Sequence, residues 1–156
     1  MEPNIVLEDV RIRLNRRRLQ TFAKRACRAA GLHGGVTVML TSNREMRALN
    51  SRFRGTARAT DVLSFPAPAS ASGFAGDIAI SVEIAAANAK QLGHSTTREI
   101  EVLILHGILH LAGYDHERDH GEMARKELAL QARLALPGGL IDRSSHPHKT
   151  IRNLGA

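Results

Sequence analysis

Apolar residues recur along the chain at two spacings, and each spacing predicts a different kind of element. Short runs that alternate, or that are rich in β-branched residues, predict four strands, at residues 4–12, 36–40, 60–66 and 77–82. Stretches with apolar residues every three or four positions predict five helices, at residues 15–30, 42–53, 83–92, 97–113 and 119–136. The uncharged segment 66–76, rich in Pro, Gly and Ser, predicts a loop between the last two strands.

These elements predict a single α+β domain with a four-stranded mixed sheet and five helices. The chain has 156 residues, a length that suits one compact domain. Because only a loop joins the strand segments 62–65 and 77–82, we expect them to pair antiparallel. We assign residues 1–136 to the domain and interpret the polar segment 137–156 as a flexible C-terminal tail.

The composition limits where the protein works. Cys27 is the single cysteine, so the chain has no intramolecular disulfide and no cysteine-based zinc knuckle. We interpret Cys27 as a structural thiol. No apolar run approaches the roughly 20 residues that span a bilayer, and the chain does not open with the pattern of a secretory signal. We therefore expect a cytoplasmic protein that does not bind membranes.

Positive charge is concentrated in the first part of the chain. The formal net charge is +7, and residues 10–59 carry thirteen of the 22 Lys and Arg residues but one acidic residue, Glu45. This distribution is typical of a surface that contacts a polyanion, although a charge run can also be a solvated face. With four Phe, one Tyr and no Trp, the chain offers few rings for base stacking. We expect nucleic acid to be bound through its phosphates and to dissociate as the salt concentration rises.

Three histidines in the segment HGILHLAGYDH have the spacing of metal ligands. His106 and His110 are four residues apart in a predicted helix, so both imidazoles project from one face. Gly113 follows where the helix must end in a residue that tolerates positive φ, and the resulting turn brings His116 back toward the first pair. The pattern predicts a zinc ion held by three neutral imidazoles with a fourth position open, as in catalytic zinc sites. Imidazole ligands also suit nickel and other divalent ions.

The residue after the first histidine separates two kinds of hydrolase. The spacing resembles that of the metzincin proteases, which place their general base, a Glu, directly after the first histidine. Here that position is Gly107, which disfavours a protease. Attack on a phosphodiester has less need of that carboxylate and needs a cation near the phosphate instead.

A wider resemblance lies in three segments of the chain, NSRFRGTARATDVLSFP, GDIAIS and HGILHLAGYDHERD. Over about residues 45–135 the chain is similar to the YbeY family of bacterial endoribonucleases. The resemblance implies an α+β fold with one zinc ion per chain held by the three histidines. It implies cleavage of single-stranded RNA in ribosomal RNA maturation, especially at the 3′ end of the small-subunit RNA, and a role in ribosome quality control. It also implies contact with the small ribosomal subunit and its assembly factors.

Residues outside the histidine pattern receive candidate roles as well. The resemblance places the family's functional arginine at Arg54, whose planar guanidinium group would clamp a phosphate. Arg54 and the metal ligand His110 are therefore our candidate catalytic residues. Asp61 and Asp77 are candidates for carboxylates that orient a histidine N–H. The equally weighted alternative is that Asp61 only caps the TDVLSFP segment and that Asp77 only closes a turn.

The favoured hypothesis is hydrolysis of an RNA phosphodiester, with either water or the 2′-OH of the RNA as nucleophile. The first alternative is a non-catalytic ribosome-assembly factor, in which zinc only locks the last helices together. The second and less favoured alternative is a metalloprotease.

Overall fold

The elements of the structure are those that the sequence predicts, with one short addition. The computed structural model describes residues 2–56, 58–136 and 149–150. Its longer strands are β1 (Asn4–Leu7), β2 (Gly35–Thr41), β3 (Val62–Pro66) and β4 (Phe74–Ser81). Its helices are α1 (Arg16–Ala30), α2 (Asn43–Arg54), α3 (Val82–Leu92), α4 (Thr96–Leu111) and α5 (Glu122–Leu134). The addition is the two-residue strand β5 (Lys149–Thr150).

The strands form one mixed sheet in the order β1-β2-β4-β3-β5. Strand β2 lies parallel to both β1 and β4, whereas β3 and β4 form the antiparallel pair that the sequence predicts. The predicted four-stranded mixed sheet is therefore confirmed, and β5 extends it at the β3 edge. Strand β5 belongs to the segment interpreted as a flexible tail. The rest of 137–156 lies outside the described residues, so the tail stays a prediction.

Three elements have a boundary that differs from the predicted one by three residues or more. Strand β1 ends at Leu7, well before the predicted end at residue 12. Strand β4 begins at Phe74, because the end of the Gly-containing segment pairs its backbone with β2 although it has no alternating apolar pattern. Helix α5 begins at Glu122 instead of Asp119. The Asp119 carboxylate accepts the backbone N–H groups of Gly121 and Met123 and so satisfies donors that a helix start leaves open.

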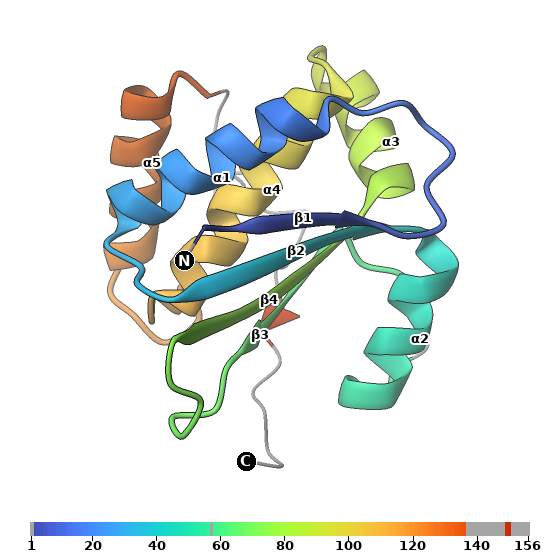
Figure 1. Ribbon diagram of the computed structural model, residues 1–156. Helices are drawn as coiled ribbons and strands as arrows, with labels where there is room; N and C mark the ends of the chain where they lie inside the picture. The colour runs from blue at the N-terminus through green and yellow to red at the C-terminus, as the bar shows by residue number, and fades with distance from the viewer. Residues whose placement is uncertain (1, 57, 137–148, 151–156) are drawn as a thin grey trace.

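The helices cover the two faces of the sheet unequally. Helices α1, α3, α4 and α5 lie over one face and α2 lies over the other (Figure 1). The main core lies under the larger helical layer and contains Cys27, whose thiol pKa is raised by burial to about 11, as expected of a structural thiol. A smaller apolar cluster of Met46, Leu63 and Ala79 lies between α2 and strands β3 and β4. Among the described residues, no helix combines the length and the apolar character needed to cross a membrane.

Helix α4 is the most deeply placed helix, since every residue from Glu99 to His110 is buried. The helix lies close against the sheet at Gly107. A Cβ atom at this position would lie 2.9 Å from both Cδ1 and Cγ2 of Ile78 on β4. Real Cβ atoms do not come so close, so the sheet leaves no room for a side chain at position 107. The glutamate that a metzincin carries there would not fit.

This contact predicts the effect of adding a methyl group to α4. We expect Gly107→Ala to lower the free energy of unfolding, because overpacking costs about 1–3 kcal/mol and a gain in helix propensity of roughly 1 kcal/mol offsets only part of it. Ile78→Val removes Cδ1, so the double variant should lose less stability than the two single variants together. Urea unfolding gives the free energy of unfolding of the two single variants and of the double variant. A Gly107→Ala protein more stable than wild type would contradict the close contact.

Candidate metal centre

The structure brings the three predicted ligands together at the end of α4. His106 and His110 lie on the last turns of this helix, and His116 lies in the turn that follows. Gly113 has φ +101°, a conformation that L side chains rarely adopt, and it reverses the chain toward the helix as predicted. The ring centroids are 5.0 Å apart for His106 and His110, 5.5 Å for His110 and His116, and 5.8 Å for His106 and His116.

The separations and the burial of these rings fit a metal ion. One nitrogen from each ring can be chosen so that the three atoms lie within 4.8 Å of one another. A shared ion at about 2.0–2.1 Å from each nitrogen would draw the three side chains closer together. His106 and His110 are buried, and His116 is half-buried. The three histidines can therefore hold one ion that is partly shielded from water.

A buried carboxylate fixes the orientation of the first ligand. His106 Nδ1 lies 2.7 Å from Glu127 Oε2 on α5, and both side chains are almost completely buried. Because an ionised carboxylate only accepts hydrogen bonds, we assign the proton of neutral His106 to Nδ1, which leaves Nε2 as the ligand atom. The second Glu127 oxygen accepts a long hydrogen bond of 3.5 Å from the Gln131 amide. This carboxylate–histidine pair is the usual support of a metal ligand.

The electrostatic surroundings keep the buried imidazoles neutral. Burial lowers the pKa of His106, against the opposing effect of Glu127. Burial, together with His106 and His116 nearby, lowers the pKa of His110 to about 2. Neutral imidazole is the form that binds metal ions, so near neutral pH little free energy is spent on removing protons from these two rings.

Among the described residues, the two predicted aspartates make no polar contact with the histidines. The Asp61 carboxylate accepts the backbone N–H of Val62 at 2.8 Å and contacts the Thr60 hydroxyl at 3.5 Å. Asp77 is an exposed residue of β4, and its neighbour Ile78 is the one that faces α4. In the described part of the chain, neither carboxylate is hydrogen-bonded to one of the three histidines. Arg54 is the last residue of α2.

The orienting carboxylate is therefore Glu127, which spacing in the sequence does not connect with His106. A weaker signal does exist, because Glu127 interrupts an apolar stripe of α5. The buried residues of this stripe recur at helical spacing, namely Met123, Glu127, Leu130 and Leu134. An acidic residue in such a stripe needs a partner inside the protein, and a buried histidine is a suitable one.

Fold and site together define a protein with a three-histidine metal centre on an α+β domain. Residues 5–135 match the family model described as Endoribonuclease YbeY. An Endoribonuclease YbeY of Koribacter versatilis is 51% identical over 145 residues, which cover 93% of this chain and 94% of that protein. One from Solibacter usitatus is 44% identical over 130 residues, which cover 83% and 86%. The chain therefore belongs to the endoribonuclease YbeY family.

A solved structure has a similar fold. The solution structure of TM1509 from Thermotoga maritima matches with a TM-score of 0.61 and 30% sequence identity. The match covers 85% of this chain and 88% of that chain. The resemblance seen in the sequence motifs is thus confirmed at the level of the family and of the fold.

The Glu127–His106 contact predicts how the metal affinity responds to substitution. We expect Glu127→Ala to weaken metal binding by about 10–100-fold, the usual cost of losing a carboxylate behind a histidine ligand. Glu127→Gln retains an oxygen that can accept from Nδ1–H, so its loss should be smaller. Competition with a chromogenic chelator measures the metal affinity of both variants. Equal affinities for Glu127→Ala and wild type would show that this carboxylate does not support the ligand.

The buried Asp61 carboxyl predicts a pH dependence of stability. Burial raises its pKa to about 7, with the Glu99 charge as a smaller cause. In the unfolded chain the pKa is about 3.9, so between these values the folded protein holds a proton that the unfolded chain has released. This group therefore favours folding at low pH, and its contribution is lost as the pH rises toward 7. Relative to wild type, Asp61→Asn should gain stability between about pH 5 and pH 8. Urea unfolding of both proteins at the two pH values measures this gain. A difference in free energy of unfolding that does not change with pH would contradict the raised pKa.

Proposed function

We propose that this chain is a zinc-dependent endoribonuclease that hydrolyses phosphodiester bonds of single-stranded RNA. The observation that carries the proposal is the cluster of three histidines at the end of α4, with Glu127 behind His106. The family to which the chain belongs, endoribonucleases involved in rRNA maturation, supports RNA as the substrate. We further propose that the chain acts at the 3′ end of small-subunit rRNA and in ribosome quality control. Its partners would then be the small ribosomal subunit and its assembly factors.

The chain's own residues divide the chemical work. His106, His110 and His116 hold the ion, and Glu127 keeps His106 in the tautomer and orientation that binding requires. One zinc ion per chain would supply Lewis acidity toward water and toward a phosphoryl oxygen. Arg54 neutralises the charge of the reacting phosphate through its planar fork of N–H donors. Basic residues of α1 and α2 raise the local concentration of RNA.

The packing of α4 argues against peptide hydrolysis. A metzincin-type protease needs a carboxylate directly after the first histidine, and here Gly107 lies against Ile78. The non-catalytic alternative has a specific observation in its favour. The Glu127–His106 contact already joins α5 to α4, so an ion at this site would also stabilise the two helices. The experiment below separates this role from catalysis.

Substitutions at the two candidate catalytic residues test the proposal. We expect His110→Ala to lose bound metal and RNA cleavage together, while circular dichroism shows a folded protein. Arg54→Ala should retain the metal and lose about 100-fold or more in kcat, because a fixed donor to the developing charge is missing. Arg54→Lys keeps the charge without the planar fork, so its activity should be intermediate. Metal analysis and cleavage of a purified single-stranded RNA provide the two readouts.

The outcomes distinguish the alternatives. Residual cleavage by metal-free, folded His110→Ala would mean that the ion is structural or that the preparation contains another nuclease. Activity must therefore vanish in His110→Ala and fall by about 100-fold or more in Arg54→Ala. The products identify the nucleophile, because a 2′,3′-cyclic phosphate would exclude direct hydrolysis as the cleaving step. Hydrolysis of an unstructured peptide that stops with a chelator would support the protease alternative.

A further inference from the structure

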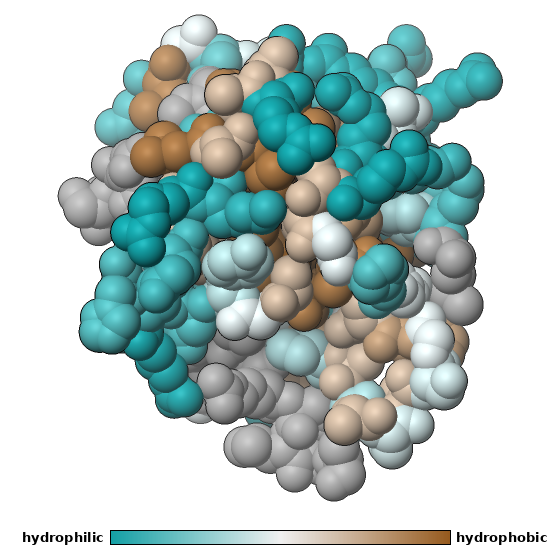
Figure 2. Space-filling model, turned by 90° about the vertical axis from the view of Figure 1, so that its left-hand side faces the viewer, coloured by the Kyte–Doolittle hydropathy of each residue, from teal (hydrophilic) through white to brown (hydrophobic). Residues whose placement is uncertain are grey.

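A second candidate site, a positively charged groove, lies between three helices. An open groove of about 540 Å³ is bordered by α1, by the first turns of α4 and by the end of α5. Arg17, Arg18 and Arg25 line it from α1, and Arg98 and Glu101 line it from α4. Four guanidinium groups therefore share the groove with one carboxylate, which leaves an excess of positive charge. The molecule viewed from the left-hand side of Figure 1 shows hydrophilic residues on both sides of a strip of apolar ones (Figure 2).

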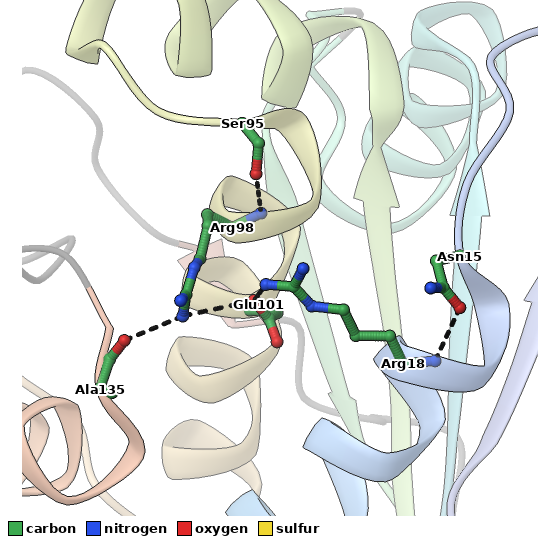
Figure 3. A network of polar contacts seen from close by, with 6 residues as sticks. All are labelled: Asn15, Arg18, Ser95, Arg98, Glu101 and Ala135. Carbon is green, nitrogen blue, oxygen red and sulfur yellow. Dashed lines mark hydrogen bonds and ion pairs between the residues drawn. The ribbon is translucent and has the colours of Figure 1, made fainter.

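The carboxylate holds two of these arginines in place. Arg18 Nη2 donates to Glu101 Oε1 at 3.1 Å, and Arg98 Nη1 lies 3.9 Å from the same oxygen (Figure 3). Arg98 Nη1 also donates to the carbonyl of Ala135 at 2.9 Å. Glu101 is buried, whereas the side chains of Arg18 and Arg98 are 44% and 39% exposed. Two partly exposed guanidinium groups from different helices are thus anchored on one buried carboxylate, with N–H donors to spare for a ligand.

The remaining arginines extend the site along α1. Within the described part of the chain, the side chains of Arg17 and Arg25 make no hydrogen bond or ion pair. A neighbouring groove of about 600 Å³ shares Arg17 with the first one and adds Arg16 and Lys24, of which Lys24 is ion-paired with Glu2. The positive surface therefore continues from one side of α1 to the other. Such a surface matches a ligand with a row of negative charges better than it matches a single small anion.

We propose that the α1–α4–α5 groove binds the phosphodiester backbone of RNA away from the bond that is cleaved. This inference rests on the proposed function. Arginine forks fit phosphate oxygens, and Glu101 keeps two of them positioned before RNA arrives, which lowers the entropic cost of binding. Glu101 and His110 are nine residues apart on α4, which is two and a half helical turns, so they lie on opposite sides of the helix. The groove and the histidine cluster therefore contact different parts of one RNA.

The salt dependence of RNA binding tests this site directly. The background is His110→Ala, in which RNA should stay intact, and the probe is a labelled oligouridylate of roughly 20 nucleotides, longer than one binding site usually covers. We expect the slope of log Kd against log salt concentration to fall by about 0.7 in Arg25→Ala and by about twice that in Arg17→Ala/Arg25→Ala. Lys90→Ala is the control, because Lys90 is an exposed cation of α3 outside the groove. Fluorescence anisotropy provides the readout.

The positioning role of Glu101 has a separate test. Glu101→Gln raises the net positive charge of the groove but removes the carboxylate that anchors Arg18 and Arg98. If anchoring matters, this variant should bind the oligouridylate more weakly than its parent at every salt concentration. Tighter binding would show that Glu101 only offsets charge, and would overturn its role as a positioning residue.

Failure of this inference can be told from failure of the proposed function. Salt slopes of the groove variants equal to that of Lys90→Ala would overturn the groove, whether or not the wild-type protein cleaves RNA. Reduced slopes with no cleavage by the metal-loaded wild type would support the groove and overturn the proposed function. If the groove variants lost affinity for polyglutamate but not for oligouridylate, the ligand would be an acidic protein and the RNA assignment would be wrong. When His110 is intact, the groove variants should raise KM by a larger factor than they lower kcat.

Discussion

Every residue of α4 from Glu99 to His110 is buried, so each polar side chain of this segment must find a partner inside the protein. Glu99 contacts His94 Nε2 at 2.7 Å in the segment after α3, Glu101 contacts Arg18 of α1, and His106 contacts Glu127 of α5. An unsatisfied buried charge would cost several kcal/mol. The three contacts therefore constrain how the neighbouring segments pack on the helix. They determine which segments must surround it, and they place α1 beside the positive groove and α5 beside the histidine cluster.

The two halves of α4 serve different electrostatic purposes. Its first turns carry Arg98 and Glu101 at the edge of a positive groove, where guanidinium groups remain accessible to solvent. Its last turns carry His106 and His110, whose lowered pKa values keep them uncharged. A polyanion is attracted by the first region and not repelled by the second. Binding strength and reactivity can thus be adjusted separately, because the residues responsible lie in the first and in the last turns of one helix.

The parts of the site that depend on local geometry could be predicted from the sequence, and those that depend on helix packing could not. The spacing of His106, His110 and His116 around Gly113 specifies the cluster because a helix and one turn are enough to assemble it. The four main strands and five helices follow from apolar periodicity in the same way. Glu127 is 21 positions after His106, and only the packing of α5 on α4 brings the two side chains together. Strand β5 pairs through two backbone positions, which leave no mark in the side-chain pattern.

The two aspartates are predicted partners of the histidines that the tertiary structure does not bring into contact with them. Asp61 directly precedes β3 and Asp77 lies in β4, and both strands pack against α4, so the sequence motifs made either aspartate a reasonable partner for the histidines. The alternation of side chains along a strand decides the matter for Asp77, because Ile78 takes the position that faces α4. Asp61 instead accepts the N–H of Val62 at the start of its own strand. The register of a strand against a helix is a tertiary property that one sequence does not reveal.

The contact between Gly107 and Ile78 also restricts how this scaffold could change its chemistry during evolution. Replacing Gly107 by glutamate would restore the sequence motif of a peptidase in one step, yet the new side chain would enter the space that Ile78 already fills. A smaller residue on β4 would have to appear first, and by itself it would leave a cavity in the main core. Each single step therefore passes through a less stable protein. Two enzyme classes that differ at one position of a short motif are in this way kept apart by the packing of a helix on a sheet.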